Sequence, residues 1–160
     1  MNVEPMPSAR SFPARFSAEE AYHLGRGTWP IRAVTSARVE LPPGLDAPGR
    51  ARGAIEDHLD GHLTLQEAQD LRLLVTEVVT NAVVHGAQVQ GPVLHLAVSK
   101  RCVRVEVCDR GSGFELPPLA PREALGAGGY GLMFVDRLTT RWGISGNDGT
   151  CVWFEVDRDA

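Results

Sequence analysis

Two neighbouring stretches of alternating residues constrain most strongly what this 160-residue chain can fold into. In residues 94–98 and again in residues 103–107, every second side chain is aliphatic, which is the pattern of half-buried β-strands. The connection Ser99-Lys100-Arg101 is short, so we expect the two stretches to pair as an antiparallel hairpin. One face of each strand is purely aliphatic and therefore needs a helical layer over it. On the other face, Arg104 and Glu106 either pair with each other or face a partner.

The remaining patterns predict the elements that surround this hairpin. Thr64 followed by Glu67 is a capping box, which predicts that a long helix begins after Thr64, and Gly86 is a signal for its end. We expect strands at about 36–41, 142–145 and 151–156, and helices at about 48–60, 65–85 and 129–139. This order predicts an α+β fold: a two-layer α/β sandwich whose mixed, mostly antiparallel sheet carries the helices on one face.

Residues 1–34 differ from the rest of the chain, because Pro and Gly interrupt any long periodicity there. We therefore expect a partly flexible N-terminal tail over residues 1–34 and one folded domain over residues 35–160. No apolar run approaches the roughly 20 residues that span a bilayer, and residues 1–16 lack a signal-type apolar stretch. These features predict a cytoplasmic protein that does not enter a membrane. The net charge of −4 argues against direct binding of nucleic acid by bulk electrostatics.

The cysteines, the histidines and the single lysine argue against two kinds of site. Cys102, Cys108 and Cys151 are odd in number and have no metal-like spacing, so we expect three free thiols. The five histidines are scattered, and no zinc site is predicted. Lys100 is the only lysine and no glycine precedes it, which excludes a P-loop for binding phosphates.

The helix expected at 65–85 carries the first candidate functional residues. Glu77, Asn81 and His85 lie within about 80° of one another around the helix and border its apolar stripe. A carboxylate and an amide beside a core are costly unless something pairs with them, and a Mg²⁺-nucleotide would supply such partners. The alternative is a helix edge with both groups solvated, and the helix alone favours that alternative.

A second candidate is the segment Asp109-Arg110-Gly111-Ser112-Gly113, where a buried strand gives way to a loop. A carboxylate there can accept the exocyclic N–H of adenine, whereas guanine presents a carbonyl at that position. Gly111 and Gly113 permit positive φ and a close approach of the backbone to a ligand. An ordinary Asp-Gly turn is the alternative, and the segment alone favours it.

Two further segments complete the set. Gly129 and Gly131 lie at the start of a helix, where free backbone N–H groups and the helix dipole can hold phosphate. Thr150 opens the last strand and can bind a base directly or through water. The alternative for the glycine segment is a flexible hinge, and the alternative for Thr150 is an ordinary threonine in a strand. The occurrence of all four signals in this order within one domain favours a nucleotide site over four separate coincidences.

With these motifs, the chain resembles the GHKL (Bergerat-fold) ATP-binding superfamily over about residues 36–156. Residues 74–86 resemble its N box, residues 109–113 its first glycine box, and residues 129–135 its second. The short chain and the Asn-Ala-x-x-His-Gly sequence at residues 81–86 are similar to the anti-sigma-factor serine kinases of that superfamily. The resemblance implies that residues 35–160 form an ATP-binding, kinase-like domain.

The resemblance also implies a role for each candidate residue and names the cofactors ATP and Mg²⁺. Asn81 would bind Mg²⁺, Glu77 would be the catalytic general base, and Asp109, assisted by Thr150, would recognise adenine. The glycines would shape the pocket and its phosphate loop; they are Gly111, Gly113, Gly129 and Gly131.

The function implied by the resemblance is that of a protein serine/threonine kinase and anti-sigma factor. Such a kinase sequesters a sigma factor and phosphorylates a small antagonist protein, whose unphosphorylated form releases the sigma factor; a homodimer is common in the group. The chain departs from this group in its expected nucleotide lid, residues 114–128, which carries one cation, Arg122. Transfer of a phosphoryl group needs positive charge near it.

Two other functions remain open at this point. The chain is alternatively a catalytically silent ATP-binding module that regulates a partner by docking, although Glu77 favours the kinase. A detached histidine-kinase catalytic domain is the third hypothesis. It is disfavoured because the chain lacks a long dimerising helix and because His85 falls within the expected ATP site.

Overall fold

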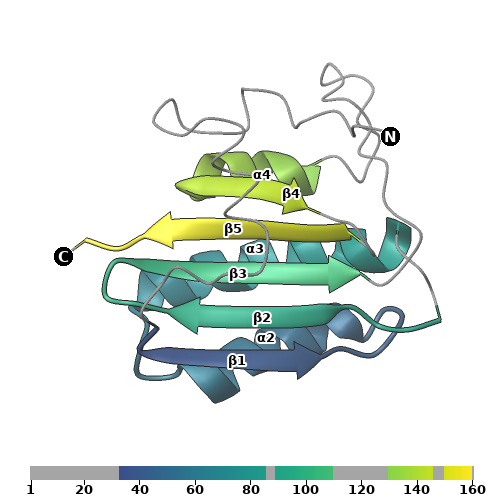
Figure 1. Ribbon diagram of the computed structural model, residues 1–160, viewed down its shortest axis with the longest axis horizontal. Helices are drawn as coiled ribbons and strands as arrows, with labels where there is room; N and C mark the ends of the chain where they lie inside the picture. Colours follow the sequence, from purple (N-terminus) through teal and green to yellow (C-terminus); the bar gives the residue numbers. More distant parts are fainter. Residues whose placement is uncertain (1–32, 86–88, 110–129, 146–149, 160) are drawn as a thin grey trace.

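The computed structural model describes residues 33–85, 89–109, 130–145 and 150–159. These residues form two layers, with three helices packed on one face of a five-stranded sheet (Figure 1). In chain order the elements are β1 (Thr35–Glu40), α2 (Ala47–Leu59), α3 (Leu65–His85), β2 (Val93–Val98), β3 (Cys102–Asp109), α4 (Tyr130–Leu138), β4 (Arg141–Ser145) and β5 (Thr150–Asp157). Among the helices described, none has both the length and the apolar character of a membrane span. The predicted tail lies, except for Ala33 and Val34, outside the described residues.

The strand order is β1-β2-β3-β5-β4, and every neighbouring pair is antiparallel. The predicted hairpin is confirmed, because Val98 is the register partner of Val103 across β2 and β3. The α+β class and the helices on one face are confirmed as well. The sequence analysis expected a mixed, mostly antiparallel sheet. Among the described strands, all the pairs are antiparallel.

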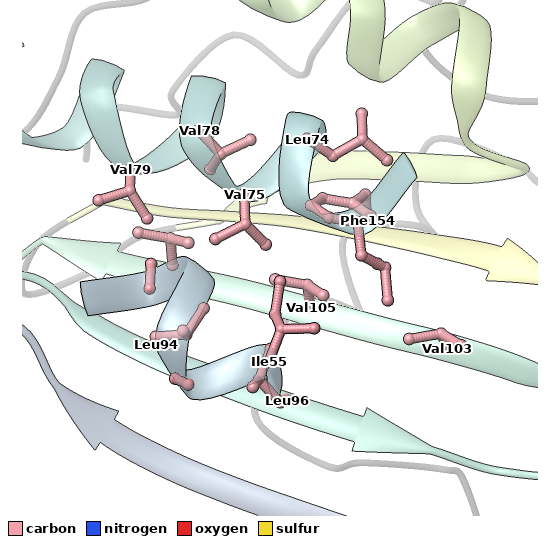
Figure 2. Packing of buried hydrophobic residues seen from close by; sticks show 14 of the residues in the cluster. Ile55, Leu74, Val75, Val78, Val79, Leu94, Leu96, Val103, Val105 and Phe154 are labelled. Atoms are coloured by element: carbon pink, nitrogen blue, oxygen red, sulfur yellow. The ribbon is translucent and has the colours of Figure 1, made fainter. Parts of the chain in front are cut away.

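The core lies between the helices and the aliphatic face of the hairpin. Figure 2 shows Leu94, Leu96, Val103 and Val105 of the hairpin beneath side chains of α3, including Val75 and Val78. Full burial of one such side chain contributes roughly 1.5–3 kcal/mol. This packing therefore fixes which face of α3 points inward and which residues remain at its edges.

Two sets of hydrogen bonds fix the start of α3, one within its first turn and one from Arg158 after β5. The Thr64 backbone N–H donates to Glu67 Oε2 at 2.7 Å, and the Glu67 N–H donates to Thr64 Oγ1 at 3.1 Å, so the predicted capping box is confirmed. Arg158, just beyond β5, donates from Nε to Glu67 Oε1 at 2.8 Å and from an Nη to the His62 carbonyl at the same distance. The end of the last strand is thereby tied to the beginning of the helix.

The face of the sheet away from the helices carries a buried network of charges. Arg104 is 2% exposed and donates to Glu155 at 2.9 Å and to Glu106 at 3.3 Å, while Arg141 donates to Glu155 at 2.7 Å. The guanidinium of Arg104 also lies 4.5 Å from the ring centroid of Trp153. Of the two alternatives for Arg104 and Glu106, pairing with each other is therefore the one observed. Removing one partner of such a buried pair costs about 3–5 kcal/mol.

The pairing of β3 with β5 corrects the prediction of three free thiols. Cys108 and Cys151 are direct register partners on these strands, and their sulfurs form a disulfide. Cys102 remains a free thiol, and burial raises its pKa. The two bonded cysteines are 43 residues apart in the sequence. They become neighbours only through the strand register, which their spacing does not encode.

The segment leading into β2 passes close to the end of β1. At Gly91, an added Cβ would overlap the Leu41 carbonyl oxygen and lie 2.6 Å from the Pro42 carbonyl carbon. Because both neighbours are backbone atoms, neither can move aside without shifting the chain. Glycine at this position therefore permits a contact between two backbone segments.

Substituting Gly91 by Ala should destabilise the protein, because the overlap forces these backbone segments apart. Overpacking of this kind costs typically about 1–3 kcal/mol. The matched control is Gly53→Ala within α2, where an added Cβ meets nothing within 4 Å; replacing a helical glycine by alanine there should stabilise by about 0.5–1 kcal/mol. Urea denaturation measures both free energies of unfolding, and equal stabilities for the two variants would contradict the expectation.

Protonation of Glu67 should weaken the fold in acid. Burial, the largest single influence, raises the pKa of Glu67, but the hydrogen bonds from Arg158 and Thr64, with the Arg158 charge, outweigh it and hold the pKa below the ordinary value of 4.5. A carboxylate with a lowered pKa stabilises the folded state above its unfolded pKa, and this contribution is lost as the pH falls through the folded pKa.

The variant Glu67→Gln isolates this effect. The difference in free energy of unfolding between wild type and variant should be largest near about pH 7 and should shrink below about pH 4.5. Urea denaturation across the acidic range measures it. A difference that stays constant down to about pH 3 would show that the carboxylate's charge is not what stabilises this end of α3.

Candidate functional site

Glu77 and Asn81 occupy the flank of α3 that faces away from α2. On the other flank, Thr76 accepts a hydrogen bond at 3.0 Å from the guanidinium of Arg52 in α2. At 3.6 residues per turn, Glu77 and Asn81 lie about 100° and about 140° around the helix axis from Thr76. Both side chains are half-buried, and α4 lies on the other side of α3 from α2 (Figure 1). The prediction that these polar groups border the buried stripe is therefore confirmed.

Asp109 ends β3 on the helix-covered side of the sheet. It continues the alternation of Val105 and Val107, which both belong to the core, and it is only 7% exposed. Its register partner on β5 is Thr150. The structure thus brings together two of the predicted residues that are far apart in the sequence, at the point where both strands meet their loops.

A pocket of about 490 Å³ adjoins Asp109. Its walls come from the connection between β1 and α2, the end of α3, and the residues before β2. The lining residues are Pro43, Gly44, Leu45, Ala82, Val83, Val84, Gln90, Pro92 and Asp109. The lining is mostly apolar with one carboxylate, and the volume falls within the range of about 300–1,000 Å³ for small-molecule sites.

The pocket contains only part of the predicted site. It brings Asp109 together with the end of α3, but Asn81 and Glu77 are not among its lining residues. Asn81 directly precedes the three helix residues that form one wall. The wall at residues 43–45 and Gln90 were not predicted, because the sequence marks them only as parts of turns.

The helix predicted to begin at about residue 129 is confirmed as α4. The helix begins at Tyr130, so Gly131 lies in its first turn. The first N–H groups of a helix have no acceptor within the helix, and together with the helix dipole they can bind an anion. Gly111, Gly113 and Gly129 lie outside the described residues, as does the side chain of His85.

The disulfide adjoins the same strand ends. Cys108 directly precedes Asp109, and Cys151 directly follows Thr150. The covalent bond therefore fixes the β3–β5 register one residue from the Asp109–Thr150 pair. Because successive strand residues point to opposite faces, the sulfurs lie on the charged face and the carboxylate of Asp109 on the helix side.

The donor groups present fit a Mg²⁺-nucleotide. Mg²⁺ prefers a small number of protein oxygens together with phosphate oxygens and waters, and the half-buried side chains of Asn81 and Glu77 supply oxygens on one helix flank. An apolar pocket with a buried carboxylate suits a planar base that donates a hydrogen bond. The described residues thus include donor types suited to the base and to the metal ion.

Comparison with known proteins agrees with this geometry. Residues 41–156 match the family model described as a histidine kinase-like ATPase domain. A stretch of 54 residues is 39% identical to a protein named anti-sigma F factor from Clostridium acetobutylicum; the match spans 32% of this chain and 38% of that relative. The match to the family model covers most of the described fold, including α3, the end of β3 and the start of α4. The chain therefore belongs to the family of histidine kinase-like ATPase domains, the GHKL fold that its motifs resemble.

Proposed function

We propose that this chain is an ATP-binding regulatory protein that acts as an anti-sigma-factor-like protein serine/threonine kinase. The observation that carries the proposal is the position of Asp109, a buried carboxylate at an apolar pocket, opposite Thr150 on the next strand. The membership of the family supports ATP as the ligand.

Asp109 is proposed to select adenine. Its carboxylate accepts a hydrogen bond from the exocyclic amino group of the base, and the hydroxyl of Thr150 assists directly or through water. Guanine would place a carbonyl oxygen against the carboxylate, and a buried acceptor that faces another acceptor costs about 1–3 kcal/mol or more. ATP would therefore be favoured over GTP.

The phosphates are proposed to lie between α3 and the first turn of α4. Asn81 would hold Mg²⁺ through its side-chain oxygen, and the N–H groups near Gly131 would bind phosphate oxygens, with Gly111, Gly113 and Gly129 shaping the loop. When bound, Mg²⁺ supplies positive charge to the phosphates. The expected lid, residues 114–128, has Arg122 as its one cationic side chain. Backbone N–H groups would therefore make many of the contacts to the phosphates.

Glu77 is proposed as the general base. It lies one helical turn before Asn81 on the same flank of α3. From there its carboxylate would accept the proton of a serine hydroxyl that attacks the terminal phosphate. The acceptor serine would belong to a small antagonist protein.

The partners are proposed from the relative's printed name, anti-sigma F factor, over a match that spans 38% of that protein. A sigma factor would be held by this chain, and an antagonist protein would be its phosphorylation substrate; a homodimer belongs to the same proposal. The second candidate function is a catalytically silent ATP-binding module that acts by docking. The partly buried Glu77 beside Asn81 favours the kinase, because docking alone does not require a base there.

Asp109→Asn should weaken ATP binding by about 10-fold or more, because a hydrogen bond to a charged acceptor contributes about 1.5–3 kcal/mol. It should also reduce the preference for ATP over GTP, since the amide can donate to the guanine carbonyl. Isothermal titration calorimetry with Mg²⁺ present measures both affinities. The control Asp57→Asn changes an exposed carboxylate of α2 and should leave them unchanged. Folded wild type that binds no ATP would refute the proposal.

Glu77→Gln separates the kinase from the docking module. In a kinase the variant should keep its ATP affinity within a few fold but lose about 10²–10⁴-fold in phosphate transfer, the usual contribution of a general base. Transfer of labelled γ-phosphate to a candidate antagonist protein measures this loss. Glu56→Gln, an exposed residue of α2, is the matched control. Wild type that binds ATP, transfers no phosphate and still holds its partner would favour the docking module.

A further inference from the structure

The charged face of the sheet brings metal-type donors together from three adjacent strands. His95 on β2 is the register partner of Glu106 on β3, Cys108 follows two residues later on the same face, and Cys151 on β5 is the partner of Cys108. One donor atom each of His95, Glu106 and Cys108 lie within 4.8 Å of one another. Cys151 joins this group because its sulfur is bonded to that of Cys108.

Neighbouring groups hold the Glu106 carboxylate toward the sulfur. Its Oε2 accepts a hydrogen bond from Arg104 at 3.3 Å, and its Oε1 lies 3.3 Å from Cys108 Sγ. Such an outer partner fixes the orientation of a ligating carboxylate in metal sites. Glu106 is buried, whereas His95, Cys108 and Cys151 are half-buried, so an ion can reach the group while the protein shields it from most of the solvent.

We infer that His95, Glu106, Cys108 and Cys151 form a tetrahedral site for a zinc-like divalent cation when the Cys108–Cys151 disulfide is reduced. One imidazole nitrogen, one carboxylate oxygen and two thiolates are ligands that Zn²⁺ takes in fourfold coordination, at about 2.0–2.3 Å. The ligand atoms of such a site are roughly 3–4 Å apart. The donor atoms of His95, Glu106 and Cys108 already lie within 4.8 Å of one another, and the backbone register places Cys151 on the same face beside Cys108.

The disulfide and the cation exclude each other, because both use the same sulfurs. A dithiol reductant supplies two electrons and two protons: the Cys108–Cys151 S–S bond breaks, each sulfur takes one proton, and the dithiol closes to its own disulfide. Binding of the cation to the two thiols then releases both protons to solvent. The site therefore exists only in the reduced chain, and oxidation by a disulfide of the same class expels the cation.

This site is separate from the one proposed for the nucleotide. The four ligands lie on the face of the sheet away from the helices, whereas Asp109 and α3 are on the helix side. The inference does not rest on ATP binding or on kinase activity. Its test therefore uses binding of the metal alone.

The experiment is a titration of the full chain with Co²⁺ in place of Zn²⁺, because the absorption spectrum of bound Co²⁺ shows which kinds of ligand hold it. The chain is reduced with a dithiol, which is removed under argon, and absorption spectra are recorded without nucleotide. Reduced wild type should bind one equivalent, with a thiolate-to-cobalt charge-transfer band and tetrahedral ligand-field bands, and Zn²⁺ should displace it. The oxidised chain should show neither band.

Variants assign the ligands. Cys108→Ser and His95→Ala should each weaken Co²⁺ binding by about 10–100-fold or more, whereas Cys102→Ser should not, because Cys102 lies at the far end of β3. Circular dichroism checks that each chain is folded. The inference is overturned if reduced wild type shows no thiolate band, if Cys108→Ser binds as tightly as wild type, or if the reduced chain loses its sheet signal and does not regain it with Co²⁺.

Discussion

The packing of α3 on the aliphatic face of β2 and β3 is the interaction on which the rest of this structure depends. It buries Leu74, Val75 and Val78 against the sheet and thereby sets the rotation of the helix. With that rotation fixed, Glu77 and Asn81 can only lie at the helix edge. The same packing covers β3 up to its last residue, so that Asp109 ends the strand beneath a helix instead of in open solvent.

The sequence predicts this layer well because the signals involved are local. Alternation gives the strands, the Thr64–Glu67 capping box gives the start of α3, and both can be recognised within a few residues. The order of the strands is not local. The disulfide between Cys108 and Cys151 and the group of His95, Glu106 and Cys108 both arise from strand register. The number and spacing of the cysteines do not encode that register and therefore led to the wrong expectation of three free thiols.

For the candidate site, too, the sequence indicated the residues with local signals and missed those brought in by the fold. Motif residues such as Asp109 and Asn81 were identified because their side-chain chemistry is unusual beside an apolar pattern. The pocket wall at residues 43–45 was not, because the sequence marks these residues only as part of a turn, and the nearby approach of Gly91 to the Leu41 carbonyl has no local signal either. A glycine that allows two backbone segments to touch has no signature that distinguishes it from a glycine in an ordinary turn.

The last residues of β3 present two different chemistries on opposite faces of the same sheet. Cys108 faces the charged network and Asp109 the helix layer, and on β5 Cys151 lies on the same face as Cys108. A bond or ion that joins the two sulfurs therefore acts on the backbone positions that also carry the Asp109–Thr150 pair. Because the strands are directly paired there, both faces depend on one backbone register.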